Sequence, residues 1–469
     1  EDLLDWSETV ASWLLKGEGH DLNEQRVAFL VPPSFIHVAI QWGIWRAGGI
    51  AVPLAISHPL PELDHVLGDA GVSILVVHPE WVSLIEPLTE KYSIRFASTE
   101  LFATLERTTL PHVQDERRAM IIYTSGTTNK PKGVVFSHRT IQAQVSSLVE
   151  AWGWTEDDHI LGILPLHHIH GIINVVTCAL WSGAVCEILG AFTAESAWKS
   201  IVERPLTLFM AVPTIYSRMI DYWEEALYDR REVLTKACSK VRLMVSGSAA
   251  LPVATLEKWD NIAGHTLLER YGMSEIGMAL SNPLVGERRP GFVGVPLPSV
   301  GVRLVNEDDK ETLVPRGSSG EIQVQGPTVF LEYWNNPQGT SAAFKDGWFL
   351  TGDIAVFEEG SYRILGRDNV DIIKTGGFKV SALEIEDVLL THPLILECAV
   401  FGRKDDTWGE KVCVAIVLRS HSPITVNNLR EWARQYLAPY KLPTEVIVVK
   451  SLPRNAMGKV TKTDLIQGW

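Results

Sequence analysis

Buried strands that alternate with helices constrain the fold of this chain more than any other feature of its sequence. Before residue 250, several segments are apolar almost throughout: 26–31, 73–78, 159–166, 185–189, 206–212 and 241–247. Helix-like stretches lie between them, such as 35–49, which ends in paired glycines. Strands without a polar face suit sheets that helices cover on both sides. The first two thirds of the chain are therefore predicted to form a layered α/β domain.

The pattern changes twice in the last third of the chain. From residue 293, short strands and glycine turns predict a small β-barrel-like subdomain at 292–366, which completes an N-terminal domain at 1–366. The remaining residues, 367–469, have an order of elements of their own and predict a small α+β C-terminal domain. Its expected elements are a helix at 382–390, strands at 397–401 and 412–418, a helix at 426–437 and a strand at 445–449.

Composition argues against several classes of protein. The formal net charge of −14 disfavours a nucleic-acid partner, and without a run of eighteen apolar residues we expect no membrane span. The five cysteines lack CxxC spacing, which favours a reducing compartment over a zinc site or a disulfide framework. The chain begins at Glu1 in a helix-like stretch, so we expect that its original N-terminus is missing, with any targeting peptide.

A donor-rich loop between Tyr123 and Gly133 is the most informative motif for function. It reads YTSGTTNKPKG and follows the apolar segment MIIY, which reads as a buried strand. Its glycines permit sharp turns that expose backbone N–H groups, its hydroxyls add donors, and Lys132 adds a positive charge. This inventory suits the phosphates of a nucleotide, although the spacing is not that of a Walker A loop. The alternative is a polar surface loop.

The chain resembles the adenylate-forming superfamily of acyl-CoA synthetases, luciferases and peptide-synthetase adenylation domains. The resemblance runs from about residue 26 to 465, with YTSGTTNKPKG followed in order by YGMSE (271–275), TGD (351–353), GRDNVD (366–371), KTGGFKVSALEIE (374–386) and PRNAMGK (453–459). It implies a large N-terminal domain of layered α/β sheets with a β-barrel-like subdomain, and a hinged C-terminal domain that swings between two steps. A carboxylate first attacks the α-phosphate of ATP, and the thiol of coenzyme A then displaces AMP. Both nucleophiles are substrates, so the enzyme contributes positioning and charge stabilisation.

The resemblance assigns a set of nucleotide contacts by position. The set is Thr124, Ser125, Gly126, Thr127, Thr128, Lys132, Gly247, Ser248, Tyr271, Asp353 and Arg367. The first six belong to the phosphate loop, and the next three flank or line the adenine pocket. Asp353 would accept the ribose hydroxyls, because a carboxylate offers two acceptor oxygens to a vicinal diol. Arg367 would contact ribose or phosphate, and a plain strand-to-helix turn at 247–248 is compatible with these roles.

Three residues are assigned to the adenylation chemistry. Glu275 matches the ligand of the Mg²⁺ ion that accompanies ATP, with a surface helix carboxylate as the alternative. Ser274 stands where most relatives have threonine, and its hydroxyl would reach the α-phosphate. Lys459 matches a lysine that enters the adenylation site and neutralises charge at the α-phosphate and the carboxylate, with a solvated lysine as the alternative.

The C-terminal domain carries two further motifs. Asp368 and Asn369 fall where the hinge residue lies, and the sequence does not choose between them. Gly376 and Gly377 match the turn that lines the pantetheine tunnel of coenzyme A, because adjacent glycines permit close backbone approach. A pure turn is the alternative.

The stretch 281–298 is the one that bears on the acid substrate. Fatty-acid and aromatic-acid ligases keep this wall apolar, whereas here it carries Arg288 and Arg289. A substrate with a second carboxylate would need such a partner, because an unpaired buried charge is costly. Arg288 stands two residues before Pro290, as in the malonyl-CoA synthetase branch, which the chain resembles. We therefore predict that Arg288 binds malonate or methylmalonate, with Arg289 as the alternative.

Two histidines complete the predicted acid pocket. His168 matches a histidine at the mouth of the acyl pocket, and His170 is typical of the malonyl-specific branch. Packing histidines remain the alternative for both. The competing functions are a short- or medium-chain acyl-CoA synthetase, a peptide-synthetase adenylation module and a non-catalytic nucleotide-binding regulator. We expect a monomer or weak homo-oligomer inside the cell, in the mitochondrial matrix before the cytoplasm.

Overall fold

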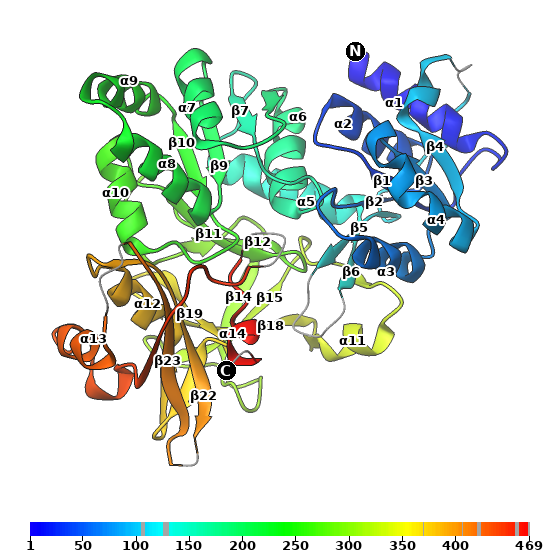
Figure 1. The fold of residues 1–469 in the computed structure, drawn as a ribbon. Helices are drawn as coiled ribbons and strands as arrows, with labels where there is room; N and C mark the ends of the chain where they lie inside the picture. Colours follow the sequence, from blue (N-terminus) through cyan, green and yellow to red (C-terminus); the bar gives the residue numbers. More distant parts are fainter. Residues whose placement is uncertain are drawn as a thin grey trace.

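The structure is a computed structural model of the 469-residue chain. It describes residues 1–104, 108–124, 131–368, 370–405, 407–419, 424–454 and 459–467. The fold is mixed α/β, with a large N-terminal domain built on two seven-stranded sheets and a smaller C-terminal domain below them (Figure 1). This confirms the predicted fold class. In the described part of the chain, no helix is long and apolar enough to cross a membrane.

The first sheet has the strand order β16-β6-β5-β2-β1-β3-β4. Its strands are β1 (Arg26–Leu30), β2 (Ile50–Pro53), β3 (Ile74–Val77), β4 (Arg95–Ser98), β5 (Arg118–Thr124), β6 (Lys132–Ser137) and β16 (Glu332–Tyr333). The helices associated with it are α1 (Asp2–Leu15), α2 (Phe35–Arg46), α3 (Leu60–Ala70) and α4 (Val82–Tyr92). Every residue of β2 and β3 is buried, as expected for strands covered on both faces.

The second sheet has the order β13-β12-β11-β10-β9-β7-β8. Its strands are β7 (His159–Gly162), β8 (Val185–Ile188), β9 (Leu208–Ala211), β10 (Leu243–Ser246), β11 (Leu268–Met273), β12 (Gly277–Ser281) and β13 (Val295–Pro296). The helices between these strands are η3 (His170–Thr177, a π-helix), α6 (Cys178–Ser182), α7 (Ala194–Glu203), α8 (Pro213–Glu225), α9 (Tyr228–Cys238) and α10 (Val253–Ala263). A stacked Trp198–Trp259 pair and Tyr216 lie in the core beneath these helices.

Helix α5 (His138–Trp152) connects the two large sheets. It begins at His138, because Ser137 is its N-cap and forms a capping box with Thr140. Its apolar face contributes Val145, Leu148 and Trp152 to the largest core cluster. The cap therefore fixes the direction in which the chain leaves the phosphate-loop hairpin.

The strand-rich part of the chain forms a five-stranded antiparallel sheet. Its elements are β14 (Gly301–Val305), β15 (Ser319–Gln325), β17 (Phe344–Lys345), β18 (Trp348–Glu358) and β19 (Ser361–Arg367), with α11 (Pro337–Ala342) beside them. Asp353 of β18 and Arg367 of β19 are register partners. Both residues are therefore brought to one place by strand pairing.

The C-terminal sheet contains β20 (Ile372–Thr375), β21 (Phe378–Ser381), β22 (Ile395–Asp405), β23 (Gly409–Leu418) and β24 (Glu445–Val448). Its helices are α12 (Ala382–Leu390), α13 (Val426–Ala433) and α14 (Lys462–Gln467). Helix α12 has the predicted bounds. Helix α13 ends earlier than the predicted residue 437, because Tyr436 N–H bonds to Ala433 O and tightens the last turn before Pro439.

Candidate functional site

A first cluster of side chains brings together a carboxylate from β18, a phenol from β11 and a guanidinium from β19. Asp353 is buried, and its Oδ2 accepts a hydrogen bond of 2.6 Å from Tyr271 Oη. Its Oδ1 accepts from Arg367 Nε at 3.0 Å. The charge of Asp353 is the main cause that raises the pKa of Arg367. The arrangement presents a carboxylate of fixed orientation.

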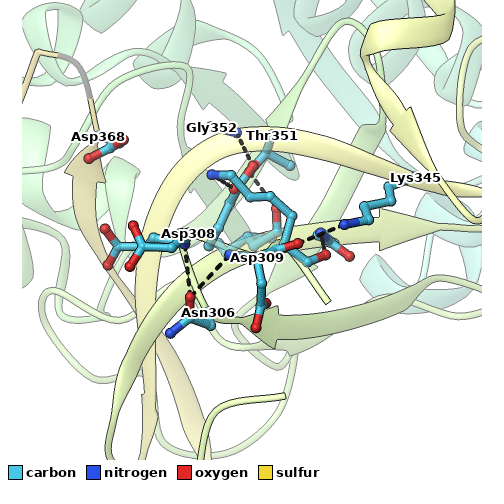
Figure 2. Close-up of polar contacts among 12 residues, drawn as sticks. Asn306, Asp308, Asp309, Lys345, Thr351, Gly352 and Asp368 are labelled. Atoms are coloured by element: carbon cyan, nitrogen blue, oxygen red, sulfur yellow. Dashed lines mark hydrogen bonds and ion pairs between the residues drawn. The ribbon is translucent and has the colours of Figure 1, made fainter. Parts of the chain in front are cut away.

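A polar network behind β18 supports that carboxylate. Buried Glu321 accepts from Gly352 N at 3.1 Å and pairs with Lys310, while Thr351 Oγ1 accepts from Asp353 N at 3.1 Å. Figure 2 shows Thr351 and Gly352 beside the loop that follows β14. In that loop Asn306 Oδ1 accepts from Asp308 N, and Lys345 donates to Asp309 O. The segment that carries Asp353 is therefore fixed by hydrogen bonds to its backbone N–H groups. The adjacent loop is itself held by hydrogen bonds.

Glu275 lies in a buried position between β11 and β12. Tyr333 Oη donates to its Oε1 at 2.9 Å, and Lys132 Nζ lies 5.0 Å from the centre of the Tyr333 ring. Burial raises the pKa of the Glu275 carboxyl, whereas Tyr333, Arg367 and Lys132 oppose that rise. One tyrosine thus joins a buried carboxylate to the lysine at the end of the phosphate loop.

A second cluster surrounds Arg270, a residue that the sequence analysis did not single out. Its side chain is 4% exposed, and Nη2 donates to Ser248 Oγ at 3.3 Å. Desolvation lowers its pKa to about 9. Nε has no hydrogen-bond partner, and in the described part of the chain no carboxylate forms an ion pair with this guanidinium. An arginine buried without a carboxylate is costly and calls for an anionic ligand.

The turn after β10 is shaped around the same guanidinium. A Cβ placed on Gly247 would lie 2.4 Å from Arg270 Cζ, so a side chain at 247 would have to displace it. Ser248 adopts φ of 70°, and its Oγ also lies 3.1 Å from His170 Nδ1. The neighbouring Glu269 points to the other face of the strand, where it accepts from Leu251 N. Burial raises its pKa to about 8, so it adds little negative charge near Arg270 at neutral pH.

The histidines predicted at the acyl pocket lie next to this cluster. His170 is buried, and burial together with the charges of Arg270 and Lys459 lowers its pKa well below the ordinary value. Desolvation, then Lys459, lowers the pKa of His168 to about 3. Nε2 of each of these rings has no hydrogen-bond partner in the described part of the chain. Both rings are therefore neutral at physiological pH and have a nitrogen available for a ligand.

Lys459 enters the same region from the C-terminal domain. The residue is exposed, yet desolvation of its ammonium group is the largest cause that lowers its pKa to about 8. The charges of Arg367 and Arg270 lower the pKa further, and Asp353 and Glu275 raise it. Lys459 therefore acts electrostatically on both clusters while the residue itself stays exposed.

The remaining predicted residues are distributed as follows. Thr124 and Lys132 are register partners at the mouth of the β5–β6 hairpin, whereas Ser125, Gly126, Thr127 and Thr128 lie outside the described residues, as does Asn369. Ser274 is half-buried beside Glu275. Asp368 pairs with Lys374 at 3.2 Å. Gly376 and Gly377 have φ of 56° and 82° and form the turn between β20 and β21, with Trp408 packed against Gly376.

Arg288 and Arg289 have other partners. Arg288 donates to the backbone carbonyls of Pro283, Thr266 and Leu284, at 3.0, 2.7 and 2.7 Å. Thr266 precedes β11, whereas Tyr271 and Glu275 lie at and beyond its other end. Arg289 pairs with Glu287 and Glu359. The structure thus brings Arg270 to the site cluster and fixes the Arg288 guanidinium to the backbone.

Within the described residues, no group of three histidine, cysteine or acidic side chains could hold a metal ion. Glu275 does suit Mg²⁺, which usually takes only one or two protein carboxylates when it is bound with a nucleotide triphosphate. It is a buried carboxylate with one oxygen fixed by Tyr333. The residues present therefore fit a magnesium ion carried in with ATP.

Comparison with known proteins agrees with this geometry. Residues 1–334 match the AMP-binding enzyme family, and residues 384–459 match the C-terminal domain of AMP-binding enzymes. The chain belongs to the AMP-binding enzyme family, within the adenylate-forming superfamily.

Similar proteins share almost the whole length of the chain. The mitochondrial malonate–CoA ligase ACSF3 of Xenopus laevis is 46% identical, over 97% of this chain and 84% of the relative. A malonate–CoA ligase of Arabidopsis thaliana is 41% identical, over 95% of this chain and 78% of the relative. The ATP-bound structure of MatB from Rhodopseudomonas palustris has a TM-score of 0.91 at 33% identity, and covers 99% of this chain and 92% of that structure.

Two residues of the clusters were missed by sequence reasoning. Arg270 immediately precedes YGMSE, and this adjacency to a recognised motif was the signal that could have identified it. Tyr333 lies in a two-residue strand far from any recognised motif. Pairing of β16 with β6, opposite Val134, and the hydrogen bond from Phe330 N to Glu275 O bring Tyr333 to Glu275, and local sequence does not encode these contacts.

Proposed function

We propose that this chain is an ATP-dependent malonate–CoA ligase that also accepts methylmalonate. The observation that carries the substrate class is Arg270, a buried guanidinium without a carboxylate partner beside Ser248 and His170. Similarity to malonate–CoA ligases along nearly the full chain supports the same reading.

The reaction has two displacement steps. A malonate carboxylate oxygen attacks the α-phosphorus of ATP, and the bond from that phosphorus to the bridging oxygen of pyrophosphate breaks. The sulfur of coenzyme A then attacks the acyl carbon, the bond to AMP breaks, and the thiol proton passes to solvent. Neither step needs a nucleophile from the protein, so the chain acts by positioning and charge stabilisation.

The nucleotide would lie across the first cluster. Asp353 would accept the ribose hydroxyls, with Arg367 beside it and Tyr271 and the turn at Gly247 next to the adenine. The phosphate loop, with Lys132 at its end, would hold the phosphates. Glu275 would hold the magnesium ion, oriented by Tyr333, and the ion neutralises charge on the triphosphate when it is bound.

The acid would lie across the second cluster. The reacting carboxylate would face Lys459, whose charge opposes the negative charge that gathers at the α-phosphate. The distal carboxylate would take the free donor capacity of Arg270, with neutral His168 and His170 beside it. We therefore assign the distal carboxylate to Arg270 in place of Arg288, which already donates to the backbone carbonyls of Pro283, Thr266 and Leu284.

Domain movement would separate the two steps. We assign residues 1–366 to the domain that binds ATP and the acid, and 367–469 to the moving domain. The hinge would lie at Asp368 or Asn369, where β19 of one sheet gives way to β20 of another. Lys459 would leave after adenylation, and the Gly376–Gly377 turn would enter with coenzyme A. The names of the animal relatives support a mitochondrial location, and the matrix is our assignment.

The test is ATP–pyrophosphate exchange with malonate, methylmalonate, propionate, acetate and octanoate. Malonate should be fastest, with methylmalonate second, because only these acids give Arg270 a counter-charge. Formation of the coenzyme A thioester with release of AMP should follow when coenzyme A is added. Fastest exchange with octanoate would replace this proposal with a medium-chain acyl-CoA synthetase.

A further inference from the structure

A second lysine, Lys462, lies three residues after Lys459. Unlike Lys459 it is buried, and two carboxylates raise its pKa. Lys462 opens α14, and its side chain is 8% exposed. Its Nζ lies 2.6 Å from Asp371 Oδ1 and 2.7 Å from Glu386 Oε1. Desolvation alone would lower the pKa of Lys462, but the charges of Glu386 and Asp371 outweigh it and raise the pKa. The ammonium is therefore a permanent cation within two carboxylates.

One of those carboxylates closes the turn that carries Arg367. Asp371 Oδ2 accepts from Arg367 N at 3.1 Å, and Asp371 N–H donates to Arg367 O at 2.8 Å. The Arg367 side chain in turn contacts Asp353. A continuous line of hydrogen bonds thus joins Lys462 to the nucleotide side of the site.

The other carboxylate ties Lys462 to the core of the C-terminal domain. Glu386 lies on α12 and accepts from Val400 N of β22 at 2.7 Å. The segment that follows Lys459 is fixed to an earlier part of the chain, because Val460 pairs with Arg454 and Thr461 N–H bonds to Pro453 O. Lys459 therefore directly precedes a segment, Val460–Lys462, that these contacts and the ion pairs of Lys462 hold in place.

We propose that Lys462 is a positioning residue for adenylation. Its ion pairs with Asp371 and Glu386 hold the Val460–Lys462 segment, which Lys459 directly precedes, and the Arg367 turn as one unit, so that the two cations reach the α-phosphate region in fixed geometry. The inference rests on the proposed role of Lys459. It matters because a misplacement of about 1 Å can cost on the order of 10²-fold in rate.

The test separates the two half-reactions in a set of variants. Lys462→Met removes the cation and keeps most of the chain length, whereas Lys462→Arg keeps the charge. Asp371→Asn breaks the link to Lys462 but leaves an oxygen for Arg367 N, and the Lys462–Glu386 pair keeps the buried charges balanced. Lys459→Ala is the benchmark for loss of the delivered cation.

We expect Lys462→Met and Asp371→Asn to slow malonate-dependent pyrophosphate exchange about 10- to 100-fold at saturating substrates. Thioester formation from preformed malonyl-adenylate should stay within about twofold, because Lys459 has left the site in that step, and Lys462→Arg should recover part of the exchange rate. If Lys462→Met does not fold, as judged by its melting curve, Asp371→Asn decides the question.

Equal loss in both half-reactions would make Lys462 a structural anchor only and overturn the proposal. Unchanged exchange in folded Asp371→Asn would overturn it as well. If Lys459→Ala lost both half-reactions equally, the proposed function of Lys459 itself would be wrong. The benchmark variant therefore distinguishes failure of this inference from failure of the mechanism on which it rests.

Discussion

The guanidinium groups of Arg270 and Arg288 differ in how far the protein itself satisfies their hydrogen-bond donors. Arg288 donates to three backbone carbonyls and so fixes the loop at 283–289 to the start of β11. Arg270 is more deeply buried, yet within the described residues it donates to Ser248 and its Nε has no partner. The charge of Arg288 that the protein itself satisfies serves the fold, whereas we propose that the buried charge of Arg270 is held for a ligand.

The lysines of the C-terminal segment repeat this contrast. Lys462 is enclosed by Asp371 and Glu386, and their charges raise its pKa. Desolvation and nearby cations instead lower the pKa of Lys459 to about 8. In both pairs, Arg270 with Arg288 and Lys459 with Lys462, the residue assigned to the chemistry is the one whose charged form the ligand-free protein stabilises less. Functional sites commonly break local rules in this way, at a cost in stability.

Replacing Arg270 should have the largest effect. Arg270→Met should lower kcat/KM for malonate by a factor on the order of 10³ or more, because the distal carboxylate would be buried without a partner. Exchange with propionate should change little, so the preference between these acids should nearly vanish. Steady-state exchange assays with both acids measure this, and Arg288→Met is the matched control that should keep the preference.

Removing Lys459 should have the next largest effect. Lys459→Ala should slow adenylation about 10²- to 10³-fold, a range typical for loss of one group that stabilises charge in a transition state. Thioester formation from preformed adenylate should remain largely intact. Rapid-quench measurement of each half-reaction checks the result, and equal losses would contradict a role confined to adenylation.

Tyr333 should affect the magnesium requirement by a smaller factor. Tyr333→Phe keeps the ring beneath Lys132 and removes only the hydroxyl that orients Glu275. Loss of such an outer partner typically lowers metal affinity 10- to 100-fold, so we expect about a tenfold rise in the Mg²⁺ concentration for half-maximal exchange. Binding of Mn²⁺ to the ATP complex, followed by electron paramagnetic resonance, gives a readout independent of activity. Tyr436→Phe, at an exposed position, should leave both values unchanged.

The depressed pKa of Lys459 predicts a basic limb in the pH profile. The cation is present below its pKa of about 8 and is lost as the pH rises through that value. Because kcat/KM reports the free enzyme, exchange should fall about tenfold between pH 8 and 9, a range that lies below the pKa of about 9 of Arg270. Lys459→Ala should lack this first fall, and a wild-type profile that stays flat between pH 8 and 9 would refute the assigned charge state.

The two arginines should also differ in their contribution to stability. Arg288→Met leaves three backbone carbonyls without their donor and should cost about 2–3 kcal/mol of unfolding free energy. Arg270→Met removes an unpaired buried charge and should leave the melting temperature unchanged or raise it. Thermal melts of both variants without ligands test this contrast. The substitution that costs more activity, Arg270→Met, should cost less stability than Arg288→Met.

The sequence predicts what local patterns determine. Apolar strands and α12 appear as expected, because periodicity and capping act over a few residues. Asp353 and Arg367 were found through their motifs, and pairing of β18 with β19 joins them.

The parts that the sequence did not predict depend on contacts between distant segments. The choice of Arg288 rested on its distance from a proline, and nothing in that spacing shows that backbone carbonyls already occupy its donors. Tyr333 reaches Glu275 through contacts between distant segments, among them the strand pairing of β16 with β6. The functional state of a charged residue is set by what surrounds it in three dimensions, and that information is spread over the whole chain.

The most direct test is an experimental structure of the protein with a non-hydrolysable malonyl-adenylate analogue. The distal carboxylate should lie within hydrogen-bond distance of the Arg270 guanidinium, with Ser248 and His170 beside it and Lys459 near the α-phosphate. A distal carboxylate bound to Arg288, or one directed into solvent, would contradict the account.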